Sequence, residues 1–493
     1  MPPRNLLAIL LTIVFSLACY SVASRNKYAN LFAEAMDVVN REALHPVERD
    51  ELFVGAMNGM LQDLDEHSVY ISGQNYKSFD EDLKQEFGGV GMYVEVDPKS
   101  KMLMVLAPMP NTPAFESGMQ VGDLIVSIEG EPTYGKVRAE AVKKLRGPIG
   151  ESVKLEVKRG EQLLNKSITR ARIPVESVHG DYRNPDGSWQ FYLKEHPEIG
   201  YIRLSQFGEK SADEVREALE EIAANREIKG LILDIRANSG GLLDVAVEIC
   251  DMLIEPGLPI VKIRGRNRVV REQYDARSAP VFPSNIPVCV LIDRYSASAS
   301  EILAACLQDH ERAVMIGEQT YGKGTVQDII PIQRGESILK LTTASYWRPS
   351  GKNIDRNDEI SQETKVWGVQ PDDGFAIEQT IEDLLRNLKS RNARDIEGLA
   401  SGAEELLSQI RDAEDEQTTT DSDNGDEGVD PDDDSSSSTD ETPEDQSQNV
   451  QSSDEVEAGK TDGAEAPHVD RPMQRAIEHL QDESEIVPRL KAA

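Results

Sequence analysis

The chain has 493 residues and a formal net charge of -35, which is enough length for two or three domains with buried cores. The charge is uneven, because residues 411–470 hold 22 acidic and 2 basic residues, a net charge of about -20. Nucleic acid is excluded as a partner, since a phosphate backbone requires a basic protein face.

An apolar run behind Arg4 fills residues 5–23 and predicts a signal peptide or an N-terminal membrane anchor within residues 1–24. The small-residue pattern that ends at Ala23 offers a cleavage site, and Cys19 leaves lipidation as a less favoured alternative. In each case we expect the body of the protein to be exported, either periplasmic or anchored in the membrane on its extracytoplasmic side.

Two regions of different character follow. Residues 26–86 predict helices, because apolar residues recur at helical spacing in YANLFAEAMDVVNREAL and ELFVGAMNGMLQDL. Residues 87–172 are punctuated by glycine and contain short runs typical of strands, such as DLIVSIEG and SVKLEVKRG, with a short helix in AEAVKKL. This mixture predicts a small β-rich binding domain.

Residues 173–400 predict an α/β core. The segments IGYIRLSQF, KGLILDIRA and IPVCVLID read as buried strands, and each precedes a helical pattern. Ser211 with Glu214 has the spacing of a capping box and predicts a helix start. Strand, Gly/Ser turn and helix in succession indicate βα units around a mixed sheet.

The acidic residues 411–470 predict a disordered linker, because a stretch with this composition has too little apolar surface to form a core. Residues 471–493 recover a helical pattern in RPMQRAIEHLQ. The acidic stretch is therefore interpreted as an insertion ahead of a final helix.

Three segments carry candidate chemistry. In SASASE, the serines Ser296, Ser298 and Ser300 stand where a buried strand turns into a helix, beside backbone N–H groups that can stabilise an oxyanion. Local chemistry does not choose among them, and all three are equally compatible with simple helix capping. The loop RANSGG offers further oxyanion donors or an ordinary tight turn.

Lys323 lies between two glycines in GEQTYGKGTVQ, where burial would favour its neutral, basic form. A phosphate-binding loop is excluded, because that motif needs Ser or Thr directly after the lysine and Gly324 stands there. His310 lies too far along the helix predicted after Ser298 to reach it, and His67, His179 and His196 fall outside residues 198–385, where the alternation of strands and helices is found.

No metal or other cofactor is expected, because the sequence has no HExxH motif and no Cys/His cluster. Cys250, Cys289 and Cys306 each lie in an apolar segment and predict small buried core residues without a required disulfide.

These motifs resemble the C-terminal processing (tail-specific) peptidases, serine proteases with a PDZ domain and a Ser/Lys active site. LDEHSVYI (64–71) is similar to the family signature LDPHSxYx, with Glu66 in place of Pro. RANSGGLL is similar to RxNPGGxL, with Ser239 in place of Pro, and SASASE with GEQTYGKGTVQ matches the active-site signature. The resemblance covers about residues 30–385 and the last helix near 472–481.

The resemblance implies roles that local chemistry leaves open. Ser298 would be the nucleophile, Lys323 the general base, and Gln327, about one helical turn further along, the residue that orients the lysine. Ala299 with Gly240 or Gly241 would supply the oxyanion hole. The implied fold is a multidomain α/β protein: an N-terminal helical segment, an inserted PDZ domain at 87–172, an S41-like, ClpP/crotonase-like βα core at 173–400, and the disordered acidic insertion.

The implied substrates are proteins or peptides with apolar C-termini, bound by strand addition to the PDZ domain. The predicted groove residues are Gly89, Val90, Gly91, Met92, Val94, Val142 and Leu145, and Arg146 is a weaker candidate for a link to the active site. The N-terminal helices are compatible with a homodimer. The alternatives are a catalytically silent PDZ scaffold, an enzyme acting on acyl-CoA substrates on a related fold, and transpeptidation in place of hydrolysis.

Overall fold

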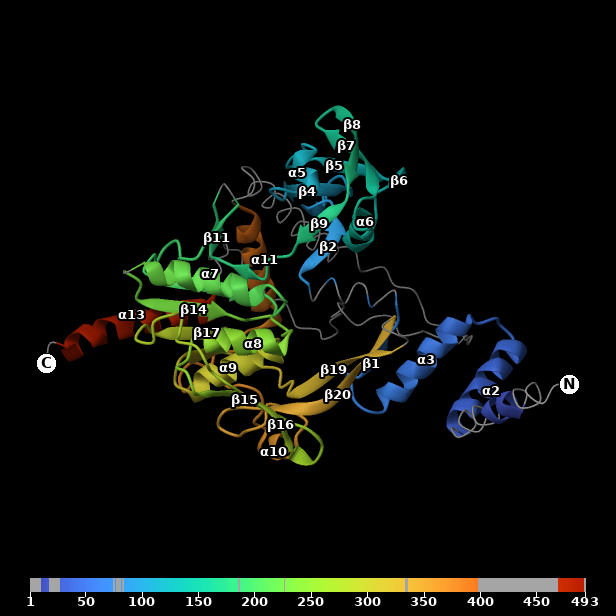
Figure 1. The fold of residues 1–493 in the computed structure, drawn as a ribbon. Coiled ribbons are helices and arrows are strands. Elements are labelled where there is room, and N and C mark those ends of the chain that lie inside the picture. Colours follow the sequence, from blue (N-terminus) through green and yellow to red (C-terminus); the bar gives the residue numbers. More distant parts are fainter. Residues whose placement is uncertain are drawn as a thin grey trace, which may run out of the picture.

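The computed structural model describes residues 10–16, 27–73, 76, 81, 84–184, 187–225, 227–332, 336–397 and 469–491. An α/β core lies at the centre, a small β-rich domain lies beside it, and helices α2 (Lys27–Glu42) and α3 (Arg49–Gln62) extend to one side (Figure 1). The predicted acidic linker, apart from its last two residues, lies outside the described residues.

The core is built on a five-stranded sheet in the order β10-β13-β14-β17-β18. Its strands are β10 (Val178–His179), β13 (Ile199–Leu204), β14 (Gly230–Asp234), β17 (Val288–Ile292) and β18 (Val314–Gly317). The last four are parallel and β10 is antiparallel to β13. Every residue of β13, β14 and β17 is buried, as expected for parallel strands covered on both faces. The predicted mixed sheet of βα units is confirmed.

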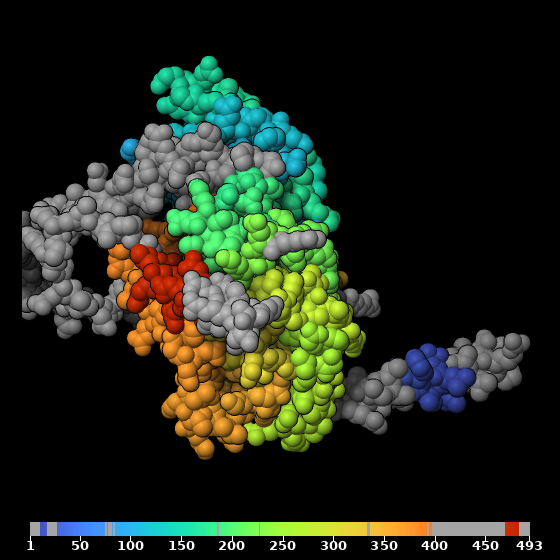
Figure 2. Space-filling model, turned by 90° about the vertical axis from the view of Figure 1, so that its left-hand side faces the viewer, coloured from blue at the N-terminus to red at the C-terminus, as the bar shows by residue number. Residues whose placement is uncertain are grey.

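Helices cover both faces of this sheet. On one face α7 (Ser211–Ala224), α8 (Leu243–Asp251) and α9 (Ala299–Asp309) pack in the largest apolar cluster, which includes the buried Cys250 and Cys306. On the other face α13 (Arg471–Lys491) places Ala476 and Leu480 against strand residues that include Cys289. Figure 2 shows α13 in red on the surface of the body. All three cysteines are buried, as predicted.

The start of α7 differs from the predicted capping box. The N-cap residue is Lys210, and Ser211 is the first helical residue. Glu214 accepts hydrogen bonds from the backbone N–H and the hydroxyl of Ser177, at 2.9 and 2.6 Å, instead of bonding back to its own helix. The capping-box prediction is therefore wrong, because the Glu214 carboxylate binds Ser177, which lies just before β10, and not the start of its own helix.

A second five-stranded sheet forms an arm of the core. It contains β1 (Val69–Ile71), β20 (Ser337–Trp347), β15 (Pro259–Arg264) and β16 (Val270–Asp275) in that order, with β19 (Thr325–Ile332) also paired to β20. The short helices η1 (Arg266–Arg268) and α10 (Glu359–Thr364) lie in its connections. Because β1 is a strand, the expected helical region ends earlier than residue 86, and residues 69–71 join the core by pairing with β20.

The small domain is bounded by the paired strands β2 (Glu86–Gly89) and β9 (Ala171–Pro174). Between them lie β3 (Met92–Val96), β4 (Leu103–Pro108), α5 (Pro113–Glu116), β5 (Leu124–Ile128), β6 (Glu131–Pro132), α6 (Arg138–Leu145), β7 (Ser152–Arg159) and β8 (Gln162–Thr169). The buried faces of these strands and of α6 form a separate apolar cluster. This agrees with the small β-rich domain predicted from the glycine-punctuated sequence.

The small domain contacts the core through α11 (Ile381–Glu397), which in turn contacts β11 (Tyr182–Arg183), the strand paired with β12 (Trp189–Gln190). Ile396 of α11 packs against Met104, Leu106 and Ala107 of the small domain. Among the described residues, which include only 10–16 of the apolar N-terminal run, no helix is long and apolar enough to cross a membrane.

Candidate active site

Ser298 lies on the turn between β17 and α9. Buried Asp293 holds this turn, because its carboxylate accepts hydrogen bonds from the N–H groups of Tyr295 and Ser296, each at 3.0 Å. Ser298 has a φ of 56° and a ψ of -114°, a backbone conformation that costs a non-glycine residue about 1–3 kcal/mol. This strained turn places the serine at the N-terminus of a buried helix, where free N–H groups are found.

The glycine loop after β14 is bonded directly to the serine turn. The carbonyl of Asn238 accepts from the N–H of Ala297 at 3.0 Å and from the hydroxyl of Ser300 at 2.8 Å. Gly240 has a φ of 102°, and a Cβ at this position would lie 2.8 Å from the Cβ of Ser298. Only glycine therefore permits the loop to approach the serine this closely.

The three predicted oxyanion donors differ in their hydrogen bonding. The Gly240 N–H donates to the side-chain oxygen of Asn238 at 2.9 Å. Among the described residues, the N–H groups of Gly241 and Ala299 meet no acceptor. The geometry therefore leaves Gly241 and Ala299, rather than Gly240, with N–H groups available to a substrate oxygen.

The loop that carries Lys323 is tied to the serine turn by the buried carboxylate of Glu301. One carboxylate oxygen, Oε2, accepts from the N–H of Ser298 at 2.9 Å and from the N–H of Lys323 at 2.8 Å. The other, Oε1, accepts from the hydroxyl of Thr320 at 2.5 Å and from the N–H of Gly322 at 2.7 Å. A single side chain therefore joins the backbones of the two residues predicted to be catalytic.

Glu301 was not among the predicted site residues, although Ser298 and Glu301 have the S-x-x-E spacing of a capping box. Burial raises the pKa of Glu301 to about 7, and its hydrogen bonds from Thr320, Gly322, Ser298 and Lys323 oppose that rise. The four donors favour the ionised carboxylate, but they only partly offset the effect of burial.

The amine of Lys323 lies in a half-buried environment. Burial lowers its pKa, and so does the neighbouring ammonium of Lys340, whereas Glu301 and Glu66 act in the opposite direction. The side chains of Lys323 and Ser298 are not hydrogen-bonded to each other in this structure. The two backbones are adjacent through Glu301.

Gln327 lies on strand β19, so the expectation that it follows Lys323 by one helical turn is wrong. Its amide nitrogen donates to the carbonyl and the hydroxyl of Thr325, at 3.2 and 2.7 Å. No hydrogen bond joins Gln327 to Lys323, and its role in orienting the lysine stays a prediction.

Two of the four histidines lie nearer the core than the sequence indicated. His179 belongs to β10 of the core sheet, where burial, Arg203 and Arg183 hold its pKa well below the usual value. Burial and the charge of Lys323 lower the pKa of His67, which places His67 within electrostatic reach of the lysine. The expectation that both lie outside the α/β region is wrong, because their segments pair with β13 and β20.

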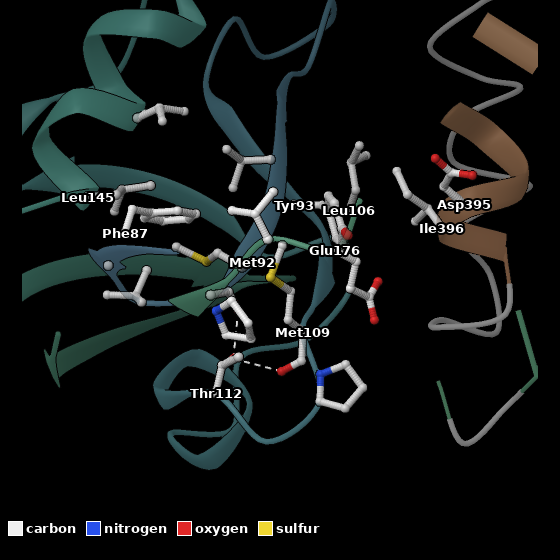
Figure 3. A pocket seen from close by; sticks show the side chains of 18 of the residues that line it. Phe87, Met92, Tyr93, Leu106, Met109, Thr112, Leu145, Glu176, Asp395 and Ile396 are labelled. Carbon is white, nitrogen blue, oxygen red and sulfur yellow. Dashed lines mark hydrogen bonds between the residues drawn. The ribbon is translucent and has the colours of Figure 1, made fainter. Parts of the chain in front are cut away.

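A cleft of about 1180 Å³ lies between the small domain and the core (Figure 3). All seven predicted groove residues line it, with β3 on one side and α6 on the other. Its opposite wall is polar and comes from the core and α11, including Glu176, Arg203 and Asp395. Ser298 and Lys323 are not among its lining residues, so the cleft and the serine turn are separate sites.

Arg146 lies at the end of α6, beside the glycine loop of the small domain. Its guanidinium sits over the ring of Phe87, with 4.2 Å to the ring centroid. The next residue, Gly147, donates its N–H to the carbonyl of Gly88 at 3.0 Å. Arg146 is therefore fixed against the loop that opens the groove, and its proposed link to the active site stays a prediction.

No cluster of His, Cys, Asp or Glu suited to a metal ion occurs within the part of the chain that the structure describes.

Comparison with known families agrees with this architecture. Residues 198–373 match the model of peptidase family S41, and residues 104–159 match that of a PDZ domain. The first match contains β13 to β20 with Ser298 and Lys323, and the second contains most of the small domain. The protein is therefore a serine peptidase of family S41 that carries a PDZ domain.

Individual relatives define the branch of the family. The chain is 36% identical over 370 residues to the carboxy-terminal-processing protease of Bartonella bacilliformis, covering 73% of this chain and 78% of the relative. It is 34% identical over 335 residues to the carboxy-terminal processing protease CtpB of Bacillus subtilis, covering 67% and 66%. A solved structure, the photosystem II D1 C-terminal processing protease, aligns at 25% identity with a TM-score of 0.41, covering 77% of this chain and 99% of that one. The chain belongs to the carboxy-terminal processing proteases.

Proposed function

We propose that this protein hydrolyses peptide bonds with a Ser298/Lys323 dyad and selects substrates by their C-termini. Neutral Lys323 accepts the proton of the Ser298 hydroxyl, the oxygen attacks the scissile carbonyl, and N–H groups at Ala299 and Gly241 hold the oxyanion. The protonated lysine then donates its proton to the leaving amine, and water releases the acyl group. Gln327 orients the lysine once its side chain has turned.

The observation that supports the dyad most directly is the shared carboxylate oxygen of Glu301. Because it accepts from the N–H of both Ser298 and Lys323, the two backbones stay adjacent while the side chains rotate. Half-burial of Lys323 and the nearby Lys340 both lower the pKa of its amine, which favours the neutral base. We also propose a ClpP/crotonase-like core, supported by the parallel strands β13, β14, β17 and β18; an experimental structure with another connectivity would contradict it.

The PDZ domain is proposed to bind the substrate C-terminus along β3, with the carboxylate at the loop around Gly88–Gly91 and apolar terminal side chains against α6. Val94 and Leu145 are buried in the groove, and Met92 and Val142 are half-buried, so the lining favours apolar residues. This site lies apart from Ser298, so recognition and cleavage would engage different parts of one extended chain.

The corresponding experiment measures kcat and KM on a peptide with a free apolar C-terminus. We expect Val142→Asp to raise KM about tenfold, since a charge in the groove opposes apolar burial, with kcat changed less. The matched control is Val137→Asp, because Val137 is 62% exposed at the start of α6 and does not line the cleft. Equal effects of the two variants, or equal cleavage of an amidated peptide, would contradict C-terminal recognition.

A homodimer through the N-terminal helices is proposed as the assembly. Helix α2 has no buried residue, and Tyr28, Leu31, Phe32, Val38 and Val39 are exposed along it. Its recorded aromatic contact is Phe32 against Phe53 of α3. A second copy would cover this apolar face. Sedimentation should show a dimer that Leu31→Glu converts to monomer, and a monomeric wild-type chain at micromolar concentration contradicts the assembly.

We propose an exported protein, periplasmic or held in the membrane through residues 1–24. The apolar run behind Arg4 supports this. Cell fractionation with N-terminal sequencing separates a cleaved signal from a retained anchor, and recovery of the whole chain in the cytoplasm contradicts export.

A further inference from the structure

The turn between α3 and β1 brings an acidic residue to the lysine loop. Glu66 lies in this turn, where the family signature has proline. Its carboxylate forms an ion pair with Arg356, 2.9 Å between Oε1 and Nη2, and lies 3.5 Å from Nε2 of His67. The partner is 290 positions away in the sequence, so the contact joins the N-terminal segment to the catalytic core.

Arg356 contacts the loop that carries Lys323. The Arg356 guanidinium lies over the ring of Tyr321, 4.1 Å from the centroid. The backbone N–H of Arg356 donates to the carbonyl of Gly322 at 2.9 Å. A Cβ at Gly322 would lie 2.8 Å from the Cβ of Arg356, so the two segments are in close contact. Glu66 therefore fixes, through Arg356, the two residues that precede Lys323.

The same turn is bonded to β20, which carries a second lysine. Asp65 accepts from the hydroxyls of Ser68 and Thr342, at 2.7 and 3.1 Å, and Val69 of β1 pairs with Lys340 of β20. Lys340 is half-buried, and within the described part of the chain its ammonium has no acidic partner within ion-pair distance.

Charged or titratable groups surround the Lys323 loop from four parts of the chain. They are Glu301 of α9, Lys340 of β20, Glu66 with His67 from the turn after α3, and Asp355 with Arg356 from the segment packed against Gly322 and Gly324. Glu301 is needed to hold the backbone together, and His67 is uncharged in most of the neutral range because burial and Lys323 lower its pKa. Arg356 is paired with Glu66, and Asp355 accepts from the N–H of Asn357, so Lys340 and Glu66 are the two oppositely charged groups that act on the Lys323 amine.

We propose that Glu66 and Lys340 are opposed positioning residues that set the charge of Lys323, and thereby the lowest pH at which the enzyme works. The inference rests on the proposed Ser298/Lys323 dyad. As an anion Glu66 stabilises the Lys323 ammonium, and as a cation Lys340 destabilises it. A proline at position 66 supplies no charge, so this chain would need a higher pH than the same chain with proline.

The test is the pH profile of kcat/KM for Glu66→Gln and Lys340→Met. On the acidic limb the rate follows the neutral fraction of Lys323. Glu66→Gln keeps an oxygen for Arg356 but removes the charge, so we expect the limb to move to lower pH, with about threefold or more activity at a fixed pH on that limb. Lys340→Met should move the limb the opposite way by a similar factor.

The controls separate this inference from its premises. Glu220→Gln makes the same charge change on the exposed face of α7 and should leave the limb unmoved. Added salt should shrink the Glu66→Gln effect, because the Glu66 side chain is 51% exposed. Limbs that stay in place, or that move in the same direction in both variants, overturn the inference. Full activity of Lys323→Ala would instead overturn the dyad itself.

Discussion

Replacing Ser298 with alanine is expected to abolish peptide cleavage, with a fall in kcat of about a thousandfold or more. Its neighbours in SASASE have structural bonds: the Ser296 hydroxyl donates to the carbonyl of Ile235 at 2.9 Å, and the Ser300 hydroxyl to Asn238 at 2.8 Å. Ser298 forms a capping box with Glu301, in which its oxygen accepts from the backbone N–H of Glu301, and among the described residues its hydroxyl donates no hydrogen bond. The hydroxyl proton on the strained turn is therefore available to a base, and we expect the substitution to remove the nucleophile.

Lys323→Ala and Lys323→Arg are expected to be equally inactive. Arginine keeps a positive charge at the site but does not lose its proton in proteins, so it supplies no base. The measurement is β-casein degradation, with thermal unfolding to show that each variant is folded. Ser300→Ala is the matched control, because it keeps the nucleophile and loses one loop hydrogen bond, which should reduce cleavage without abolishing it. Ser298→Ala turnover within about tenfold of wild type would contradict the assignment.

The α/β core could be predicted from sequence because it depends on local pattern, whereas the catalytic roles of Ser298 and Lys323 stay a proposal that the resemblance implies. Buried strands such as Val288–Ile292 are continuous apolar runs, and the following turn carries the serine. Resemblance to the family then selected Ser298 from three candidates. The resemblance to a PDZ domain also implied a groove formed by the seven residues from Gly89 to Leu145; all seven line the cleft, and their role in peptide binding stays a prediction.

Contacts between distant segments could not be predicted. Glu66 looked like a departure from the signature, and its partner Arg356 lies in a different part of the chain. Glu214 matched a local capping box, yet Ser177 takes its carboxylate. A carboxylate can accept hydrogen bonds either from a donor nearby in the sequence or from a distant one. The sequence does not indicate which donor it binds, because both would satisfy the same oxygen atoms.

Glu301 is the clearest case of a site residue that the local sequence pattern describes incompletely, and its substitution should reduce both activity and stability. Glu301→Gln keeps the size of the side chain but turns one acceptor oxygen into an N–H donor. Two buried N–H or O–H donors then face a donor, at a cost of about 1–3 kcal/mol each. We expect kcat to fall about a hundredfold or more, and the free energy of unfolding to fall by about 2–5 kcal/mol.

The dependence of stability on pH gives an independent check on Glu301. Burial raises the pKa of Glu301 from 4.5 to about 7, so the folded state holds this proton more tightly than the unfolded state does. Its contribution to stability is therefore fully present below about pH 4.5 and is lost as the pH rises to about 7. Wild type should show this decline in urea unfolding, and Glu301→Gln, which has no proton to lose, should lack it.

Cleavage activity is expected to rise over the pH range in which this contribution to stability is lost. Protonation of Glu301 replaces one acceptor position by a hydrogen, which breaks one of the bonds that hold Ser298 and Lys323 together. The enzyme should thus be most active where this carboxylate contributes least to stability. Glu301→Asp distinguishes a positioning role of the carboxylate from a purely structural one, because it restores the negative charge on a shorter side chain. A kcat higher than that of Glu301→Gln supports a positioning carboxylate. If Glu301→Gln keeps wild-type kcat while its stability drops, Glu301 holds the fold without positioning the dyad.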